Sequence, residues 1–135
     1  MARITSAAYV ATVLRFLQAY NAGDLDACEE LVDPDVGWQG VTDLRGREEV
    51  RAMLEQLRSR FLQPRVRPED FREGGGHVLM IVCFHEGDPQ AVRTEVRQSW
   101  VLDVTDDGLV HHVVAYERAA EAARAFEAIA PKVHA

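Results

Sequence analysis

Two side chains of this sequence combine proton-transfer chemistry with an apolar setting, namely His111 and Tyr20. An imidazole changes charge near neutral pH and can exchange a proton with a bound molecule, and a phenol can donate a hydrogen bond to an oxyanion. Each also has an ordinary alternative. His111 can be a polar strand residue facing solvent or a subunit, and Tyr20 a helix-end residue with its hydroxyl in water. His111 and Tyr20 are our candidate catalytic residues.

Three further side chains have the chemistry of ligand recognition. Gln98 interrupts an apolar line, and a buried amide must find a partner, which we expect to be a ligand, Tyr20 or the backbone. Trp38 and Trp100 each offer a flat apolar surface and one N–H donor, which suits an aromatic or polycyclic guest. Core filling is the better account of at least one of these two indoles. Together the three predict an apolar pocket with a few placed polar groups.

Other chemistries are not indicated. The adjacent residues His111 and His112 would send their rings to opposite faces of a strand, and no other His, Asp or Glu spacing resembles a set of metal ligands. No glycine-rich phosphate loop follows a strand, and no nucleophile elbow is present. We expect neither a metal nor a cofactor.

Composition narrows the class of protein further. The 135 residues suffice for one core, so we predict a single domain over residues 1–135. Fifteen basic against 22 acidic residues give a net charge of −7, which argues against nucleic-acid binding. Cys28 and Cys83 lie among apolar residues and far from any second cysteine, as is typical of buried free thiols. We recognise no signal peptide and no apolar run of bilayer length, and expect a cytoplasmic protein without a membrane partner.

The elements that position these residues begin with two helices that meet at a corner. Apolar residues recur with helical spacing on two faces over residues 9–20. Gly23 can adopt the left-handed conformation that ends a helix, and Asp24 can cap the short helix that follows. A third helix begins near Gly46, with an apolar stripe that ends at Phe61.

The remaining segments read mostly as strands. Pro64 and Pro68 predict an edge segment, and the glycines at 74–76 predict a turn. Residues 92–105 alternate strongly, so one face of that strand is buried and the other is wet or meets a partner. We predict strands at residues 36–39, 63–72, 77–85, 92–105 and 109–116 and a last helix at 119–129. Helices followed by antiparallel strands indicate an α+β fold.

A first helix with two apolar faces fits inside a curved antiparallel sheet better than flat on it. A curved sheet wrapped around helices in this way forms a cone, and such a cone leaves an apolar pocket at its open end. The residues that we predict to line this pocket are Phe16, Trp38, Met53, Leu57, Met80, Val82, Phe84, Gln98, Trp100, Val113 and Glu117.

Three motifs resemble the nuclear transport factor two-like superfamily, in particular its SnoaL-like and ketosteroid-isomerase-like branch. They are the corner at residues 21–24, the segment at 45–50 that opens the third helix, and the Asp107-Gly108 turn. The resemblance covers nearly the whole chain. It implies a curved sheet around the helices, a pocket at the wide end, and commonly a homodimer through the outer sheet face. It does not imply one activity, because the fold hosts enzymes and non-catalytic domains alike.

The functional positions of that superfamily are vacant in this sequence. By spacing from the corner, Phe16 stands where the isomerases have an oxyanion-hole tyrosine, and Gly40 where they have the general-base aspartate. Trp100 stands near their protonated aspartic acid, the second oxyanion donor. Ala115 stands where polyketide cyclases have an acid/base aspartate. Steroid-type isomerisation with that constellation is therefore not expected.

Two function classes follow from these observations. In the first, a small apolar or aromatic molecule binds in the pocket, with possible acid/base chemistry of the isomerase, cyclase or dehydratase kind. The resemblance places His111 on the inward parity of the last strand in this case, with Glu117 at the rim to orient it. In the second, the chain is a non-catalytic dimerisation or accessory module with a filled interior. A homodimer through the outer face predicts Arg93, Glu95 and Arg97 at or beside the interface.

Overall fold

The computed structural model describes residues 6–40, 42–88, 90 and 95–129. Among these residues, two helices precede the first two strands, a third helix follows these strands, four more strands come next, and the last element is a helix. In order, the elements are α1 (Ser6–Asn21), α2 (Leu25–Glu30), β1 (Val32–Gln39), β2 (Asp43–Arg45), α3 (Arg47–Arg58), β3 (Pro64–Gly74), β4 (His77–Glu86), β5 (Glu95–Val104), β6 (Val110–Tyr116) and α4 (Ala119–Ile129). Val92 and Arg93, within the strand that we predicted at 92–105, lie outside the described residues.

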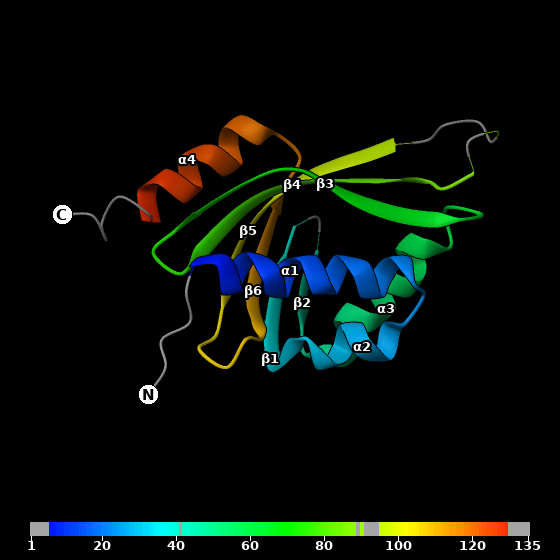
Figure 1. The fold of residues 1–135 in the computed structure, drawn as a ribbon, viewed down its shortest axis with the longest axis horizontal. Coiled ribbons are helices and arrows are strands. Elements are labelled where there is room, and N and C mark those ends of the chain that lie inside the picture. The colour runs from blue at the N-terminus through cyan, green and yellow to red at the C-terminus, as the bar shows by residue number, and fades with distance from the viewer. Residues whose placement is uncertain (1–5, 41, 89, 91–94, 130–135) are drawn as a thin grey trace.

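The strands form one curved, unclosed sheet in the order β2-β1-β6-β5-β4-β3. Figure 1 shows α1, α2 and α3 on one side of this sheet and α4 on the opposite side. The predicted α+β fold, a curved sheet around N-terminal helices with a short C-terminal helix, is confirmed. The edge position expected of the proline-containing strand is also confirmed, because β3 ends the sheet.

The sheet differs from the expected antiparallel one at β1. This strand pairs antiparallel with β2 but parallel with β6, where Trp38 lies beside Val113. Strand β2 is only three residues long, too short for an alternating pattern to show in the sequence. The parallel pair therefore brings the end of β1 next to the end of β6, although these residues are far apart in the chain.

The corner between α1 and α2 has the predicted conformation. Gly23 has φ of 73°, which closes α1 in the left-handed region. The Asp24 carboxylate accepts a hydrogen bond of 3.0 Å from the backbone N–H of Ala27. The sequence did not reveal a second role of this corner: the Asn21 amide bonds both backbone groups of Val66, at 2.9 Å and 2.7 Å. These bonds tie the end of α1 to the edge strand β3.

A β-bulge in β6 decides which side chains of that strand face the helices. Asp103 of β5 pairs with His112, but the next residue, Val104, pairs with Val110. His111 is thus the extra residue, and the alternation of β6 shifts there. As a result Val110 and Val113 are both buried, at 2% and 0% exposure, with two residues between them.

Apolar side chains form clusters on both faces of the sheet. The larger cluster fills the concave side and contains most of the aromatic residues. The smaller cluster lies under α4, where Phe126 and Ala122 pack with Leu79 and Val101. The last helix therefore covers part of the outer face that we expected to be free for a partner (Figure 1).

Candidate functional site: an aromatic pocket inside the sheet

A cavity of about 290 Å³ opens between α3 and the inner face of the sheet. Most of its wall is apolar, and the polar side chains come from the β1–β2 connection, the end of α3 and β5. The lining residues are Trp38, Gly40, Thr42, Leu44, Met53, Leu54, Gln56, Leu57, Arg60, Phe84, Gln98, Trp100 and Ala115. Six residues of the predicted lining are brought together here: Trp38, Met53, Leu57, Phe84, Gln98 and Trp100.

Three aromatic side chains form a continuous wall of this pocket. The rings of Trp38 and Trp100 meet edge to face with centroids 5.1 Å apart, and Phe84 lies 5.9 Å from Trp100. Both distances fall in the range in which aromatic pairs attract beyond simple burial. Because Trp100 is 1% exposed and Phe84 2%, the wall is rigidly backed by the core.

Gln98 is held by the wall itself. The indole Nε1 of Trp100 donates a hydrogen bond of 3.0 Å to the Gln98 Oε1. The partner of this amide within the protein is therefore Trp100, whereas we expected Tyr20 or the backbone if no ligand is bound. The Gln98 Nε2 group has no acceptor among the described residues and remains able to donate a hydrogen bond.

Gly40 and Ala115 lie next to each other in the pocket wall. A Cβ atom on Gly40 would lie 3.4 Å from the Ala115 Cβ. These are two of the positions at which the resemblance implies catalytic carboxylates, and here both residues are small and neither can titrate. The space that such side chains would occupy belongs to the cavity instead.

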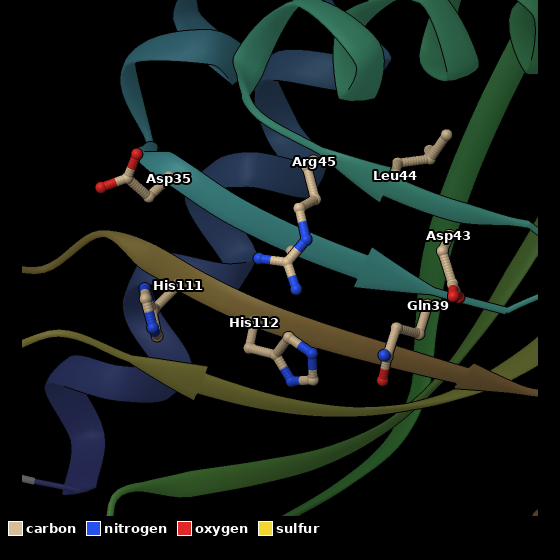
Figure 2. Close-up of a pocket in the computed structure, with 8 residues that line it drawn as sticks. Asp35, Gln39, Asp43, Leu44, Arg45, His111 and His112 are labelled. Carbon is tan, nitrogen blue, oxygen red and sulfur yellow. The ribbon is translucent and has the colours of Figure 1, made fainter.

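A second hollow, of about 250 Å³, lies on the outer face of the sheet over β1, β2 and β6. Figure 2 shows Asp35 and Arg45 on the same side of the sheet as His111 and His112. The His111 Nδ1 lies 3.9 Å from the Asp33 Oδ2, and the His111 side chain is 49% exposed. The inward orientation that we assigned to His111 is therefore wrong, because the bulge in β6 reverses the parity.

Comparison with known proteins identifies the family at this point. The model of the SnoaL-like domain matches residues 13–113. The chain belongs to the SnoaL-like domain family. No curated protein sequence matches it.

Solved structures support the same fold for this SnoaL-like domain. Bal32a, from a soil-derived mobile gene cassette, is 19% identical with a TM-score of 0.70, over 82% of this chain and 89% of that one. TerC, co-crystallised with polyporic acid, is 14% identical with a TM-score of 0.68, over 90% and 97%. RV0760c from Mycobacterium tuberculosis, in complex with estradiol-17beta-hemisuccinate, is 16% identical with a TM-score of 0.65, over 81% and 92%.

The remaining predicted lining residues of the SnoaL-like domain do not border the pocket. Phe16, Met80, Val82 and Val113 are buried in the core, between 0% and 3% exposed. Phe16 backs the wall, with its ring 6.2 Å from that of Trp38. Glu117 is exposed and lies beyond the end of β6.

Tyr20 is also outside the pocket, and neither of its two expected settings is observed. Its side chain is 1% exposed, its ring meets Phe84 edge to face at 5.6 Å, and the Arg58 guanidinium lies 4.9 Å from the ring centroid. Its hydroxyl has no hydrogen-bond partner among the described residues. Burial raises the pKa of Tyr20 to about 12. The phenol is thus a buried core group.

The charged residue of the pocket, Arg60, did not attract attention in the sequence. It follows the end of α3, and its backbone N–H donates to the Leu57 carbonyl at 3.2 Å, which continues the helical turn. The helical spacing of Met53, Leu57 and Arg60 could have revealed it. Of the described residues that line the pocket, Arg60 is the one with a charged side chain.

Three further properties hold for the described residues. None of their helices is both long and apolar enough to cross a membrane. Within the same residues, no group of three or more His, Cys, Asp and Glu side chains is placed to hold a metal ion. Cys28 and Cys83 are buried and free, and burial raises the pKa of Cys28 to about 11.

Proposed function

We propose that this SnoaL-like domain binds a small aromatic or polycyclic molecule in the inner pocket. The observation that carries the proposal is the open aromatic wall of Trp38, Trp100 and Phe84 with the amide of Gln98 beside it. Apolar walls with a few fixed polar groups are the usual composition of small-molecule sites. A volume of about 290 Å³ suits a ligand of two to three fused rings more than a large one.

The function that we propose is binding without proton transfer by the pocket residues. The lining residues in the described part of the chain include no Asp, Glu, His, Cys, Lys or Tyr, so none of them changes protonation near neutral pH. Acid/base chemistry of the isomerase, cyclase or dehydratase kind needs such a group within hydrogen-bonding reach of the substrate. His111 and His112 lie on the other face of the sheet.

Two structural neighbours support a small-molecule ligand. RV0760c was obtained in complex with estradiol-17beta-hemisuccinate, and TerC was co-crystallised with polyporic acid. Both proteins share the fold at low identity, so their ligands support the class of molecule and not its identity.

The test uses tryptophan fluorescence, because two lining residues are indoles. We expect 2-naphthol or a three-ring analogue to quench the emission saturably. Ala115→Leu fills the cavity from β6 and should weaken binding at least tenfold, whereas Val114→Leu, at the next residue on the outer face, should not. Equal binding by wild type and Ala115→Leu would contradict a pocket ligand, and a wild type that binds none of the aromatic probes would favour a non-catalytic module with an unused interior.

We also propose that the protein forms a homodimer through the outer sheet face beside α4. This surface carries an ion-pair network in which Glu69 contacts Arg97 at 2.7 Å and Arg97 contacts Glu95 at 3.0 Å. Arg93, the third residue expected there, lies outside the described residues. Sedimentation should give twice the monomer mass, and Arg97→Glu should lower the dimer fraction; a monomer at all concentrations contradicts the proposal.

For the compartment we propose the cytoplasm. The two buried free thiols support this placement, because reducing conditions keep cysteines unpaired. Fractionation of cells that express the full chain tests it, and recovery in the medium or membrane fraction would contradict it.

A further inference from the structure

We infer that the ligand of the inner pocket is an anionic aromatic molecule, a carboxylate or sulfonate whose charged oxygens pair with Arg60 while its rings lie on the aromatic wall. This inference rests on the proposed function and adds the charge of the ligand. It follows from the balance of charges and of hydrogen-bonding groups in the pocket.

The charge balance of the pocket is positive in a protein of net charge −7. Arg60 is exposed at the end of α3 and lines the cavity. Four of the described arginines pair with carboxylates, among them Arg51 with Glu55 at 3.1 Å and Arg97 with Glu69 at 2.7 Å. Arg60 forms no such pair with any of the described residues, although acidic side chains outnumber basic ones.

The hydrogen-bonding groups of the wall are mainly donors. The Gln98 Oε1 already accepts a hydrogen bond from Trp100, and the Gln98 Nε2 has no acceptor among the described residues. The Trp38 indole can only donate, and no acceptor for it occurs in the described part of the chain. Thr42 and Gln56, which can donate or accept, are exposed at the mouth.

A donor-rich, positively charged pocket selects ligands that accept hydrogen bonds and carry negative charge. The planar guanidinium presents paired N–H groups that match two carboxylate or sulfonate oxygens. Of the lining residues that the structure describes, none offers the carboxylate that an amine ligand would need. A cationic aromatic ligand is therefore disfavoured by charge.

The test compares two probes of the same shape, 2-naphthoate and the neutral 2-naphthamide, by tryptophan fluorescence at pH 7. We expect wild type to bind the acid about five to ten times more tightly than the amide, the range of a partly desolvated charge pair. Arg60→Gln should abolish this preference by weakening the acid alone, and Arg60→Lys should retain part of it. Arg124→Gln, an exposed residue of α4 with the same charge change, is the matched control and should bind like wild type.

The outcomes distinguish a failure of the anionic inference from a failure of the proposed aromatic pocket. If both probes bind equally and Arg60→Gln changes neither, the anionic inference is overturned while the aromatic pocket stands. If neither probe binds wild type, and neither member of a larger pair, estradiol hemisuccinate and estradiol, does so, the proposed function fails and the inference falls with it. A preference for the acid that survives Arg60→Gln assigns the charge recognition elsewhere and also overturns the role of Arg60.

Discussion

The two hollows on opposite faces of the sheet have similar volumes, about 290 Å³ inside and about 250 Å³ outside, but different chemistry. The inner pocket has an aromatic wall and one charged side chain, Arg60. The outer hollow is lined by two carboxylates, one guanidinium and two imidazoles, with Leu44 as its apolar side chain. The sheet thus separates the groups suited to recognise rings from the groups that can move protons.

This separation arises from alternation along strands that both hollows share. On β1, Gly37 and Gln39 line the outer hollow, whereas Trp38 between them lines the inner pocket. On β6, the bulge at His111 keeps both histidines outside while Ala115 faces inward. Residues adjacent in sequence therefore belong to sites of different chemistry.

The largest difference between the two faces should appear when a large side chain is removed from each. Trp100 is 1% exposed and contacts Trp38 and Phe84, so Trp100→Ala should lower the free energy of unfolding by about 3–5 kcal/mol. His112→Ala on the outer face should cost less than about 1 kcal/mol. Urea unfolding followed by circular dichroism measures both, and similar losses would contradict the view that the wall of the inner pocket is part of the core whereas the lining of the outer hollow is not.

A second comparison uses one glycine on each face. A Cβ on Gly37 would lie 2.9 Å from the His112 Cδ2, whereas a Cβ on Gly40 would lie at an ordinary 3.4 Å from the Ala115 Cβ. We expect Gly37→Ala to destabilise by about 1–2 kcal/mol through overpacking and Gly40→Ala to change stability by less than about 0.5 kcal/mol.

The double variant Gly37→Ala/His112→Ala is the control for this clash. Removing the imidazole should restore most of the stability that Gly37→Ala loses, which a double-mutant cycle quantifies. Additive losses would show that the close approach of Gly37 and His112 is not the cause.

A smaller effect tests the buried hydroxyl on the inner side. Because the Tyr20 hydroxyl has no partner among the described residues, Tyr20→Phe should be neutral or stabilising by about 1 kcal/mol. The folded pKa of about 12 exceeds the ordinary value of 10.0, so the stability from protonated Tyr20 is complete below pH 10 and is lost as the pH rises toward 12.

Stability measured from pH 9 to 12 distinguishes the phenol from the thiol. The pKa of Cys28, about 11 against an ordinary 9.0, contributes a loss between pH 9 and 11 in both proteins. The Tyr20→Phe variant should therefore still lose stability between pH 9 and 11 through Cys28. It should lack the further loss of stability up to pH 12 that the Tyr20 phenol causes in the wild type. Identical curves for the two proteins would refute a buried, protonated Tyr20.

The smallest effect is expected for His111. Its exposed contact with Asp33 at 3.9 Å is a surface pair, so His111→Ala should change the free energy of unfolding by less than about 0.5 kcal/mol. Binding of the naphthalene probes should be unchanged, because the imidazole lies on the far side of the sheet from the inner pocket. A loss of binding in this variant would mean that the two hollows communicate.

Much of the fold was predictable because its signals are local. Gly23 and Asp24 set the corner by backbone conformation and capping, and the last helix begins and ends at the predicted residues. Six lining residues of the pocket were predictable from apolar spacing. Arg60 was not predicted because it comes two residues after the end of α3, although it lines the pocket together with residues of that helix.

The sequence by itself determined the helices and the five longer strands, the apolar faces and the absence of carboxylates at Gly40 and Ala115. Only the tertiary structure decided which face of β6 the histidines occupy, that Gln98 is bonded to Trp100, and that Arg60 lines the same cavity as the aromatic wall. The physical reason is that strand alternation is a local rule that one bulge resets. Contacts between β1, β5, β6 and the end of α3 depend on pairings between distant segments, which no local pattern encodes.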